Sequence, residues 1–425
     1  MSALSITSKT CSLDYFLSCL NGPIKVRLDS DSRKSIQQSH KIFLELLNNG
    51  EKIYGVTTGF GDLSSISIND NDQKKLQLNL LRSHATGVGK SFDSGVTRVI
   101  MLLKLLNWSK GVSGVRTKLV QLLKELLNHD ILPVIPRQGS VGASGDLAPL
   151  AHMALPLIGE GLVNFQERIM PAMLAMKEVG LEPIVLEPKE GLSLINGTQV
   201  STAIAIKACL EAENILKVAD LSGAISVEAS LSSRSVFRSE IHKLKDHPGQ
   251  RIVASNIWNL LDKSEIVLSH KNCDKMQDPY SFRCIPHVHG ISRENYKCVK
   301  KIVENEASSV SDNPLIMPNG KILNSGHFHA ESIAQAMDNL AIAIAEIGSI
   351  AERRIHYFMK GVGDSVPPFI ASNPGLESGF MTAHVTAASL VSENKVLTHP
   401  ASVDSIPTSG GQEDFVSMAP WGGRK

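Results

Sequence analysis

The sequence lacks the features that would mark a metalloprotein, a secreted protein or a membrane protein. Its six cysteines are widely scattered and never form a C-x-x-C pair, which indicates reduced, buried thiols and no metal site. No apolar run approaches the ~20 residues that cross a bilayer. The N-terminal stretch MSALSITSKTCSLDYF lacks the basic and apolar segments of a secretory leader. We therefore expect a cytoplasmic protein without a metal or a membrane partner.

The chain also lacks an excess of charge of either sign. Its 43 Lys and Arg residues nearly balance 42 Asp and Glu residues, which leaves a net charge of +1. The basic residues are spread along the chain and interleaved with acidic ones. A surface that binds nucleic acid needs a basic excess. We therefore expect no nucleic-acid partner.

Strand-like patterns are scarce, whereas helical periodicity is frequent. Residues 97–107 and 117–128 place apolar side chains three and four positions apart, and residues 331–359 continue such a pattern for longer. Residues 200–220 read as another long helix, and residues 184–188 are the clearest strand candidate. The sequence predicts a mainly α fold, with a long central helical bundle and an N-terminal α-rich domain.

A boundary near residue 195 would divide the chain into two parts, 1–195 and 196–425. Segments without clear periodicity are expected to be loops that are functional or mobile. These segments are residues 55–70, 229–252 and 361–379.

The segment GSVGASGDLAPLAH at 139–152 carries no obvious reactive group. The serine-nucleophile pattern G-x-S-x-G fails because Asp146 stands where its last glycine should be. A phosphate loop fails because no lysine follows, and G-x-G-x-x-G is absent. One interpretation is a glycine-rich turn before a helix at 146–157, with Asp146 near the helix N-terminus.

A second interpretation uses the backbone itself. In a tight turn, the amide nitrogen of Gly145 can attack the carbonyl carbon of Ala143, and loss of water closes a five-membered ring. Dehydration of Ser144 then leaves an exocyclic methylene. The product, 4-methylideneimidazol-5-one (MIO), is an electrophile that needs no added cofactor. Strain in the turn would assist the reaction.

These residues resemble the cofactor-forming segment of the aromatic amino acid ammonia-lyase family. The resemblance covers nearly the whole chain from about residue 40 onward. Its further motifs are YGVTTGFG at 54–61, LQLNLLRSHATGVG at 76–89, LIGEG at 157–161, GLSLINGTQ at 191–199, HPGQ at 247–250, QDPYSFRCIP at 277–286, VSDNPL at 310–315 and ENKVLTHPASVDSIPTSGGQEDFVSMAP at 393–420. The resemblance implies a MIO formed from Ala143, Ser144 and Gly145.

Two positions resemble the branch of the family that acts on histidine. Ser83-His84 matches the pair that faces the substrate ring in this branch, although tyrosine enzymes also tend to carry His there. Glu413 stands where the phenylalanine and tyrosine enzymes have Asn-Gln-Asp. A buried imidazole needs hydrogen-bond partners, which His84 and Glu413 could supply. The resemblance therefore implies elimination of ammonia from L-histidine to trans-urocanate, the first step of histidine degradation.

Two alternatives stay open. One is a tyrosine or phenylalanine ammonia-lyase or aminomutase on the same fold. The other is a helical protein without enzymatic activity, in which the motif never cyclises.

The resemblance also implies roles for individual side chains. Tyr54 is the preferred base for the β-proton, with Tyr280 and Glu413 as alternatives, and a phenol must have its pKa lowered from about 10 for this role. Arg283 should pair with the substrate carboxylate through two hydrogen bonds. The full set of implied binding residues is His84, Asn196, Gln277, Arg283 and Phe328.

The sequence departs from the family pattern in three places. His327 replaces an Asn, Thr57 replaces the Asn common in the histidine branch, and the chain ends at WGGRK where family members continue with further helices. Aminomutases also carry Thr at the position of Thr57. Family members are homotetramers in which three subunits contribute to each active site, and the alanine-rich helices predicted at 200–220 and 331–359 suit such a helical core.

Overall fold

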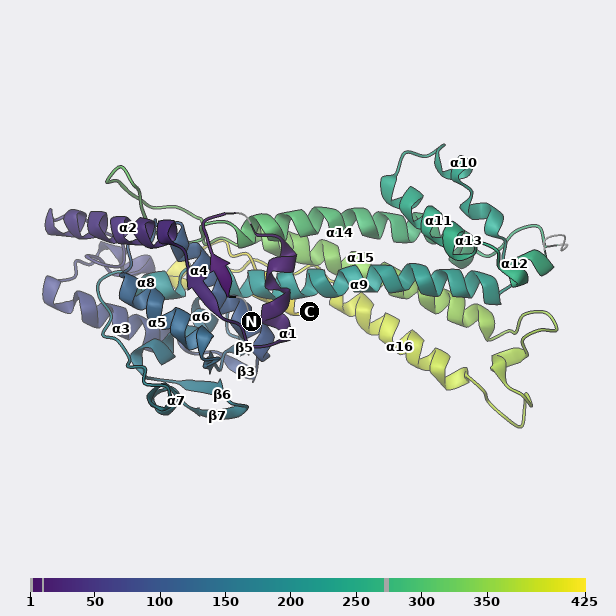
Figure 1. The fold of residues 1–425 in the computed structure, drawn as a ribbon, viewed down its shortest axis with the longest axis horizontal. Coiled ribbons are helices and arrows are strands. Elements are labelled where there is room, and N and C mark those ends of the chain that lie inside the picture. The colour runs from purple at the N-terminus through teal and green to yellow at the C-terminus, as the bar shows by residue number, and fades with distance from the viewer. Residues whose placement is uncertain (1–2, 10, 271–274) are drawn as a thin grey trace. The chain divides into compact units, whose positions relative to one another are not determined.

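The fold consists of helices joined by short strands and turns (Figure 1). The computed structural model describes residues 3–9, 11–270 and 275–425. The helices longer than ten residues are α2 (Ser30–Asn48), α3 (Gln73–His84), α4 (Ser94–Ser109), α5 (Thr117–Asn128), α9 (Gln199–Ala229), α11 (Pro248–Leu260), α14 (Ile285–Ala307), α15 (Glu331–Phe358) and α16 (Met381–Leu397). The predicted mainly α fold is confirmed.

Shorter helices and turns connect these elements. The short α-helices are α1 (Leu17–Asn21), α6 (Leu147–Ala154), α7 (Ala172–Glu178), α8 (Glu190–Ile195), α10 (Ser239–His242), α12 (Glu265–Ser269), α13 (Tyr280–Arg283) and α17 (Ala419–Arg424). The 3₁₀ turns are η1 (Leu13–Phe16), η2 (Gly61–Ser65), η3 (Asp70–Asp72), η4 (Leu155–Ile158), η5 (Arg234–Phe237), η6 (Pro368–Ile370) and η7 (Ser409–Gly411). The predicted loops at 55–70, 229–252 and 361–379 therefore contain short helices.

Strands within the described residues form four small sheets. A parallel pair joins β1 (Leu4–Ile6) to β2 (Val26–Leu28). The antiparallel sheets are β3 (Val88–Ser91) with β5 (Pro136–Gln138), β4 (Leu132–Pro133) with β6 (Leu162–Phe165) and β7 (Arg168–Pro171), and β8 (Leu315–Ile316) with β9 (Ile322–Leu323). The strand predicted at 184–188 is wrong, because this stretch lies between Pro183 and Pro188 and forms no ladder.

Contacts divide the chain into two compact units that are each discontinuous in sequence. The first unit comprises Met1–Ala208, Ile302–Met337 and Pro400–Arg424, and the second comprises Cys209–Lys301, Asp338–His399 and Lys425. The boundary expected near residue 195 stays a prediction.

The first unit is built around α4. Every residue of this helix from Gly95 to Ser109 is buried, and α1, α2 and α5 pack against it. Asp93 caps its N-terminus by accepting a hydrogen bond from the Val96 amide at 2.9 Å. The periodicity at 97–107 therefore belongs to a helix that is buried on all sides.

In the second unit, α9, α14 and α15 run side by side, and α16 extends obliquely away from them (Figure 1). The Arg293 guanidinium of α14 donates to Asp220 of α9 at 2.6 Å. Ser292 of the same helix donates to the Ala343 carbonyl of α15 at 3.0 Å. The structure confirms the helix predicted at 331–359 and extends the one predicted at 200–220 to residue 229.

Two expectations from composition need correction. The first was that all cysteines are buried, but Cys298 is exposed. The second was that no segment is long and apolar enough to cross a membrane. Helix α15 is, by length and composition alone, and half of its most apolar window is buried inside the protein. A buried core helix passes the same test.

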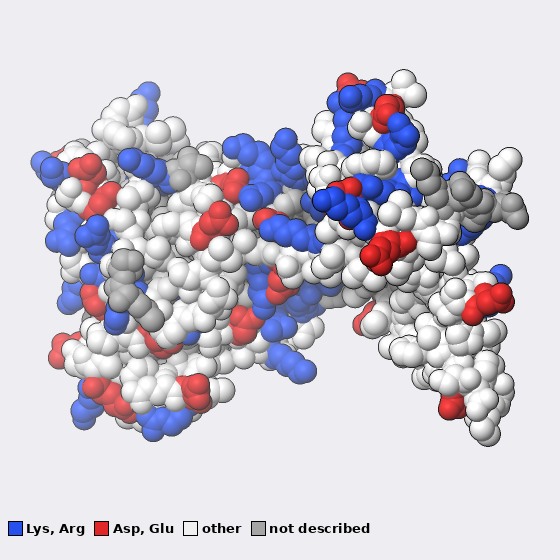
Figure 2. All heavy atoms as spheres, turned by 45° about the vertical axis from the view of Figure 1, so that its right-hand side comes forward, with Lys and Arg blue, Asp and Glu red and all other residues white. Residues whose placement is uncertain are grey.

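On the visible face of each unit, Lys and Arg are interspersed with Asp and Glu, as Figure 2 shows.

Helices α11 and α14 cross at two glycines of the second unit. A Cβ atom added to Gly290 would lie 2.5 Å from the Gln250 amide nitrogen and 2.9 Å from the Gly249 carbonyl carbon. We predict that Gly290→Ala lowers the free energy of unfolding by about 1–3 kcal/mol, because overpacking forces the helices apart. The matched control is Gly223→Ala in α9, where the nearest atom is 3.4 Å away. Denaturant titration measures both, and an equal midpoint for the two variants contradicts the prediction.

Candidate active site

The Ala143–Gly145 turn is held in a conformation that favours glycine. Ser144 and Gly145 have φ angles of 53° and 83°, in the left-handed region. A Cβ atom at Gly145 would lie 2.3 Å from the carbonyl oxygen of Gly197. Only glycine therefore fits at position 145, and the small residues around it allow the tight turn that ring closure requires.

Asp146 anchors the turn to the start of α9. Its amide donates to the Gly197 carbonyl at 2.8 Å. Its buried carboxylate accepts from the amides of Val200 at 2.9 Å and Ser201 at 2.8 Å, and from the Ser201 hydroxyl at 2.7 Å. Burial raises the pKa of Asp146 to about 6, against the lowering effect of these hydrogen bonds.

The structure has a helical segment where the sequence predicted one at 146–157, with Asp146 directly before its first residue. The α-helix α6 spans only Leu147–Ala154 and continues as the 3₁₀ turn η4. The Asp146 side chain makes no capping bond to α6, because it caps the much longer α9 instead. The segment that carries the turn is thereby tied to a distant part of the sequence.

Glu413 lies directly beside the turn. The Ser144 hydroxyl donates to its Oε1 at 3.2 Å. Its Oε2 accepts from the Thr408 hydroxyl at 3.1 Å and from the Ser409 hydroxyl. Residue 413 also forms an isolated bridge with Thr408. Three hydroxyl donors therefore hold the carboxylate next to Ser144.

Tyr54 lies near Glu413 on the loop before η2. Its hydroxyl accepts a hydrogen bond from the Gly61 amide at 2.9 Å, and its ring meets Phe60 edge-on at 6.1 Å. Burial raises the pKa of Tyr54, and the negative charge of Glu413 raises it further. The hydrogen bond from the Gly61 amide lowers this pKa but does not offset the two raising effects, so a base at this position needs a further lowering influence.

His84 is in a setting that favours its neutral form, and its ring then presents one defined acceptor nitrogen. Burial lowers its pKa, although the charge of Glu413 opposes this effect. Its Nδ1 lies 2.9 Å from the Leu80 carbonyl oxygen. Because a carbonyl only accepts, Nδ1 carries the proton and Nε2 is left as an acceptor.

Asn196 lies at the end of α8, directly before Gly197. It is 2% exposed, and its Oδ1 is buried without a hydrogen-bond partner. Buried polar atoms are nearly always paired, so an orphaned oxygen beside the turn fits a site that holds a further polar group.

Phe328 and the two departures from the family pattern lie around this region. Phe328 is half-buried in the turn before α15, and no described contact joins it to the Ala143–Gly145 turn. The Thr57 hydroxyl accepts from the Ile53 amide at 2.8 Å and thus stabilises its own turn. His327 is exposed, and its charge lowers the pKa of Glu306, which burial raises.

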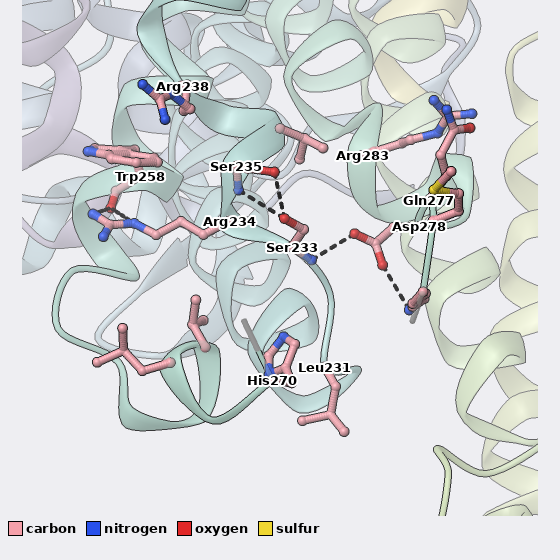
Figure 3. Close-up of a pocket in the computed structure, with 15 residues that line it drawn as sticks. Leu231, Ser233, Arg234, Ser235, Arg238, Trp258, His270, Gln277, Asp278 and Arg283 are labelled. Carbon is pink, nitrogen blue, oxygen red and sulfur yellow. Dashed lines mark hydrogen bonds and ion pairs between the residues drawn. The ribbon is translucent and has the colours of Figure 1, made fainter. Parts of the chain in front are cut away.

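The remaining three site residues belong to the second unit. Gln277 and Arg283 line a pocket of about 780 Å³, together with Trp258 and Asp278 (Figure 3). Arg283 places its guanidinium 4.7 Å from the ring centre of Tyr280, which is 71% exposed. The Nε of Arg283 is buried without a partner. A cation that keeps an unused donor is suited to bind an anionic group.

The first unit thus brings together Tyr54, His84, Asn196, Glu413 and the turn. The sequence interpretation missed Thr408 and Ser409, which hold Glu413, and the buried Lys104 of α4. A single lysine inside the apolar run VIMLLKLLN was a signal that could have identified Lys104, since a charge seldom lies on a fully buried helix.

Comparison with known proteins places this arrangement in a family. Residues 11–425 match the aromatic amino acid lyase family. The histidine ammonia-lyase of Vibrio cholerae is 46% identical over 424 residues, which cover 99% of this chain and 83% of that protein. That of Photorhabdus laumondii is 47% identical over 427 residues, with 100% and 83% covered. The chain belongs to the aromatic amino acid lyase family.

Solved structures agree in fold. Histidine ammonia-lyase from Trypanosoma cruzi superposes with a TM-score of 0.89 at 37% identity, covering 100% of this chain and 80% of that one. The phenylalanine aminomutase of Pantoea agglomerans superposes with a TM-score of 0.94 at 31% identity, with 99% and 86% covered. The chain therefore has the fold of lyases and aminomutases alike.

The proximity of Glu413 to two titrating side chains leads to a test. We predict that Glu413→Gln lowers the pKa of both Tyr54 and His84, because the lost negative charge had disfavoured the tyrosinate and favoured the imidazolium. NMR titration of protein with ¹³C-labelled tyrosine and histidine measures both shifts. Glu160→Gln, which removes an exposed partner of Arg82, is the control. A His84 pKa that rises or stays constant in Glu413→Gln contradicts the geometry.

Proposed function

We propose that the protein eliminates ammonia from L-histidine to give trans-urocanate, the first step of histidine degradation. The observation that carries the proposal is the convergence of Glu413 and His84 on the Ala143–Gly145 turn. The relatives that are 46–47% identical over nearly the whole chain are histidine ammonia-lyases, which supports the same substrate.

The proposed electrophile is MIO, formed by cyclisation of Ala143, Ser144 and Gly145. The left-handed turn, the space for glycine alone at position 145 and the orphaned Oδ1 of Asn196 all support this. The ring supplies a methylidene carbon to which the substrate amine adds, which makes that amine a better leaving group. In our proposal, Asn196 orients the polar atoms beside it.

The substrate imidazole would be bound by His84 and Glu413. The Nε2 of His84 accepts a hydrogen bond, and the Glu413 carboxylate accepts another, so a protonated imidazole ring satisfies both. A phenyl ring would leave the half-buried carboxylate without a ligand partner and so bind less well. Glu413 thereby acts as the residue that distinguishes histidine from phenylalanine.

Tyr54 is our proposed base for the β-proton, with Glu413 and Tyr280 as the alternatives. Its pKa is raised within the first unit, so a cation must approach it in the working enzyme. Arg283 is suited to supply that charge while it binds the substrate carboxylate, because its Nε has no partner among the residues that the structure describes. Gln277 and Phe328 complete the proposed binding site.

We further propose a cytoplasmic homotetramer in which several subunits share each site. Helix α9 exposes an apolar stripe at three- and four-residue spacing, formed by Ile215, Val218, Leu221 and Ile225. Figure 2 also shows few charged side chains over α16, and no residue of that helix is buried. Unpaired apolar faces of this size indicate contact with other copies of the chain.

An aminomutase is the second candidate. It is favoured by Thr57 and by the TM-scores of 0.93 and 0.94 with the tyrosine aminomutase of Streptomyces globisporus and the phenylalanine aminomutase of Pantoea agglomerans. In that case Glu413→Gln would cost little with the real substrate.

The first functional test is an ultraviolet assay for urocanate with L-histidine. We expect activity in the natural chain, none in Ser144→Ala, and a loss of about 10²–10⁴-fold in kcat/KM for Glu413→Gln, as for removal of a polar catalytic group. Glu160→Gln serves as the control and should match the natural chain. Turnover of tyrosine or phenylalanine without turnover of histidine would overturn the substrate assignment.

The second test addresses shared sites. Ser144→Ala and Arg283→Met should each be inactive alone. When the two variants are co-expressed, mixed oligomers would contain sites with an intact turn from one subunit and an intact Arg283 from another. We predict partial recovery of activity in the mixture, and none when Ser144→Ala is mixed with a second variant of the turn, Gly145→Ala. An inactive first mixture contradicts shared sites.

A further inference from the structure

Helix α4 carries side chains with polar groups, among them Lys104, Asn107 and Trp108, within the apolar core of the first unit. All its residues from Gly95 to Ser109 are buried, and Lys104 has 0% exposure. The Lys104 ammonium donates to the carbonyl oxygens of Ser193 at 3.0 Å and Asn196 at 2.8 Å. Both carbonyls lie at the C-terminal end of α8, where backbone oxygens lack helical partners. A cation is favoured there by the helix dipole.

Two neighbours of Lys104 on α4 hold the same segment. Trp108 donates its indole N–H to the Ser193 hydroxyl at 2.9 Å. The Asn107 side-chain oxygen accepts from the Ser311 amide at 2.9 Å, and the Ser311 hydroxyl accepts from the Thr198 amide at 3.3 Å. The segment from residue 193 to 198 is therefore fixed to α4 at both ends.

This segment is the surface against which the reactive turn is packed. Gly197 lies in its middle, between the carbonyl held by Lys104 and the amide held by Ser311. The Gly197 carbonyl accepts from the Asp146 amide, and Gly145 is in direct backbone contact with Gly197. A small shift of Asn196 would thus move the Gly197 backbone, against which the Ala143–Gly145 turn packs.

Burial of the Lys104 ammonium costs desolvation free energy. Desolvation lowers the pKa of Lys104 to about 7, although the negative charges of Asp312 and Asp146 raise it. An apolar side chain of similar length would avoid that desolvation cost, since buried charges often stabilise less than well-packed apolar residues. What the Lys104 ammonium provides, and an apolar side chain would not, is two hydrogen bonds that fix the carbonyl groups of Ser193 and Asn196.

We infer that Lys104 is a positioning residue for formation of the electrophile, because it holds the Asn196–Gly197 link against which the Ala143–Gly145 turn closes. The inference rests on the proposed function. In the step that it assists, the Gly145 nitrogen bonds to the Ala143 carbonyl carbon, and the carbonyl oxygen leaves as one water together with the amide hydrogens of Gly145 and Ser144. Ser144 loses its Cα proton and its hydroxyl as a second water, so the atoms balance.

The test compares intact masses of folded full-length chains. Lys104→Met removes the ammonium and keeps the length of the side chain. We expect Lys104→Met to fold, but most chains should keep both waters, since a displacement of about 1 Å slows such a reaction about 100-fold. The matched control is Arg98→Met, which removes another buried cation of α4, one paired with Asp130 at 2.6 Å. This control should be destabilised but should lose both waters completely.

Circular dichroism and thermal unfolding establish folding for each variant. Lys104→Gln, which keeps an N–H donor on a shorter side chain, should show an intermediate fraction of cyclised chains. Complete loss of both waters in folded Lys104→Met overturns the inference. Failure of both Lys104 variants to fold while Arg98→Met folds also overturns it, because the ammonium is then a general folding requirement. A natural chain that keeps both waters contradicts the proposed function itself.

Discussion

The close contact between Gly145 and Gly197 is the constraint on which the rest of the site depends. No side chain fits between these two backbones, because a Cβ atom at Gly145 would lie 2.3 Å from the Gly197 oxygen. The contact is held from one side by Asp146, which binds the start of α9. It is held from the other side by the hydrogen bonds of α4 to the end of α8. The turn is thus compressed by elements that are far apart in sequence, and strain of this kind can favour ring closure.

Glu413 gives the second organising interaction, since one carboxylate influences several groups at once. It accepts a hydrogen bond from the Ser144 hydroxyl and raises the pKa of Tyr54. It also opposes the lowering of the His84 pKa by burial. The same charge that would bind an imidazole in the proposed function therefore makes Tyr54 a weaker acid. A working enzyme needs a compensating cation near Tyr54, which is why the proposed site draws Arg283 from another subunit.

Much of the fold could be predicted from the sequence, because apolar periodicity identifies buried helical faces directly. The helix at 117–128 agrees with α5 at both ends. The strand at 184–188 was wrongly predicted from its apolar residues, although Pro183 and Pro188 argue against a strand, and the structure shows no partner strand for it. The end of α9 was also missed, since its second half carries apolar side chains on an exposed stripe as well as on its packed faces, which leaves little periodicity.

The sequence indicates which residues form the candidate site, but it does not indicate their geometry. Sequence motifs pointed to Glu413 and Asn196. Only the fold shows that the Ser144 hydroxyl donates a hydrogen bond to Glu413 and that the side-chain oxygen of Asn196 has no described partner. The position of Asp146 before α6 followed from the sequence, but its capping of α9 did not, because a capping residue looks alike in sequence whether it caps its own helix or a distant one. Long-range hydrogen bonds, such as those of Lys104, leave no local pattern beyond an unexpected charge.

The central claim is that the backbone of the Ala143–Gly145 turn becomes the reactive group. Mass spectrometry of the tryptic peptide spanning residues 138–168 tests it most directly, because cleavage after Arg137 and Arg168 isolates the turn. The account predicts a peptide that is lighter than its sequence by two water molecules, with the loss confined to residues 143–145. A peptide from folded, natural protein with the full unmodified mass would contradict it.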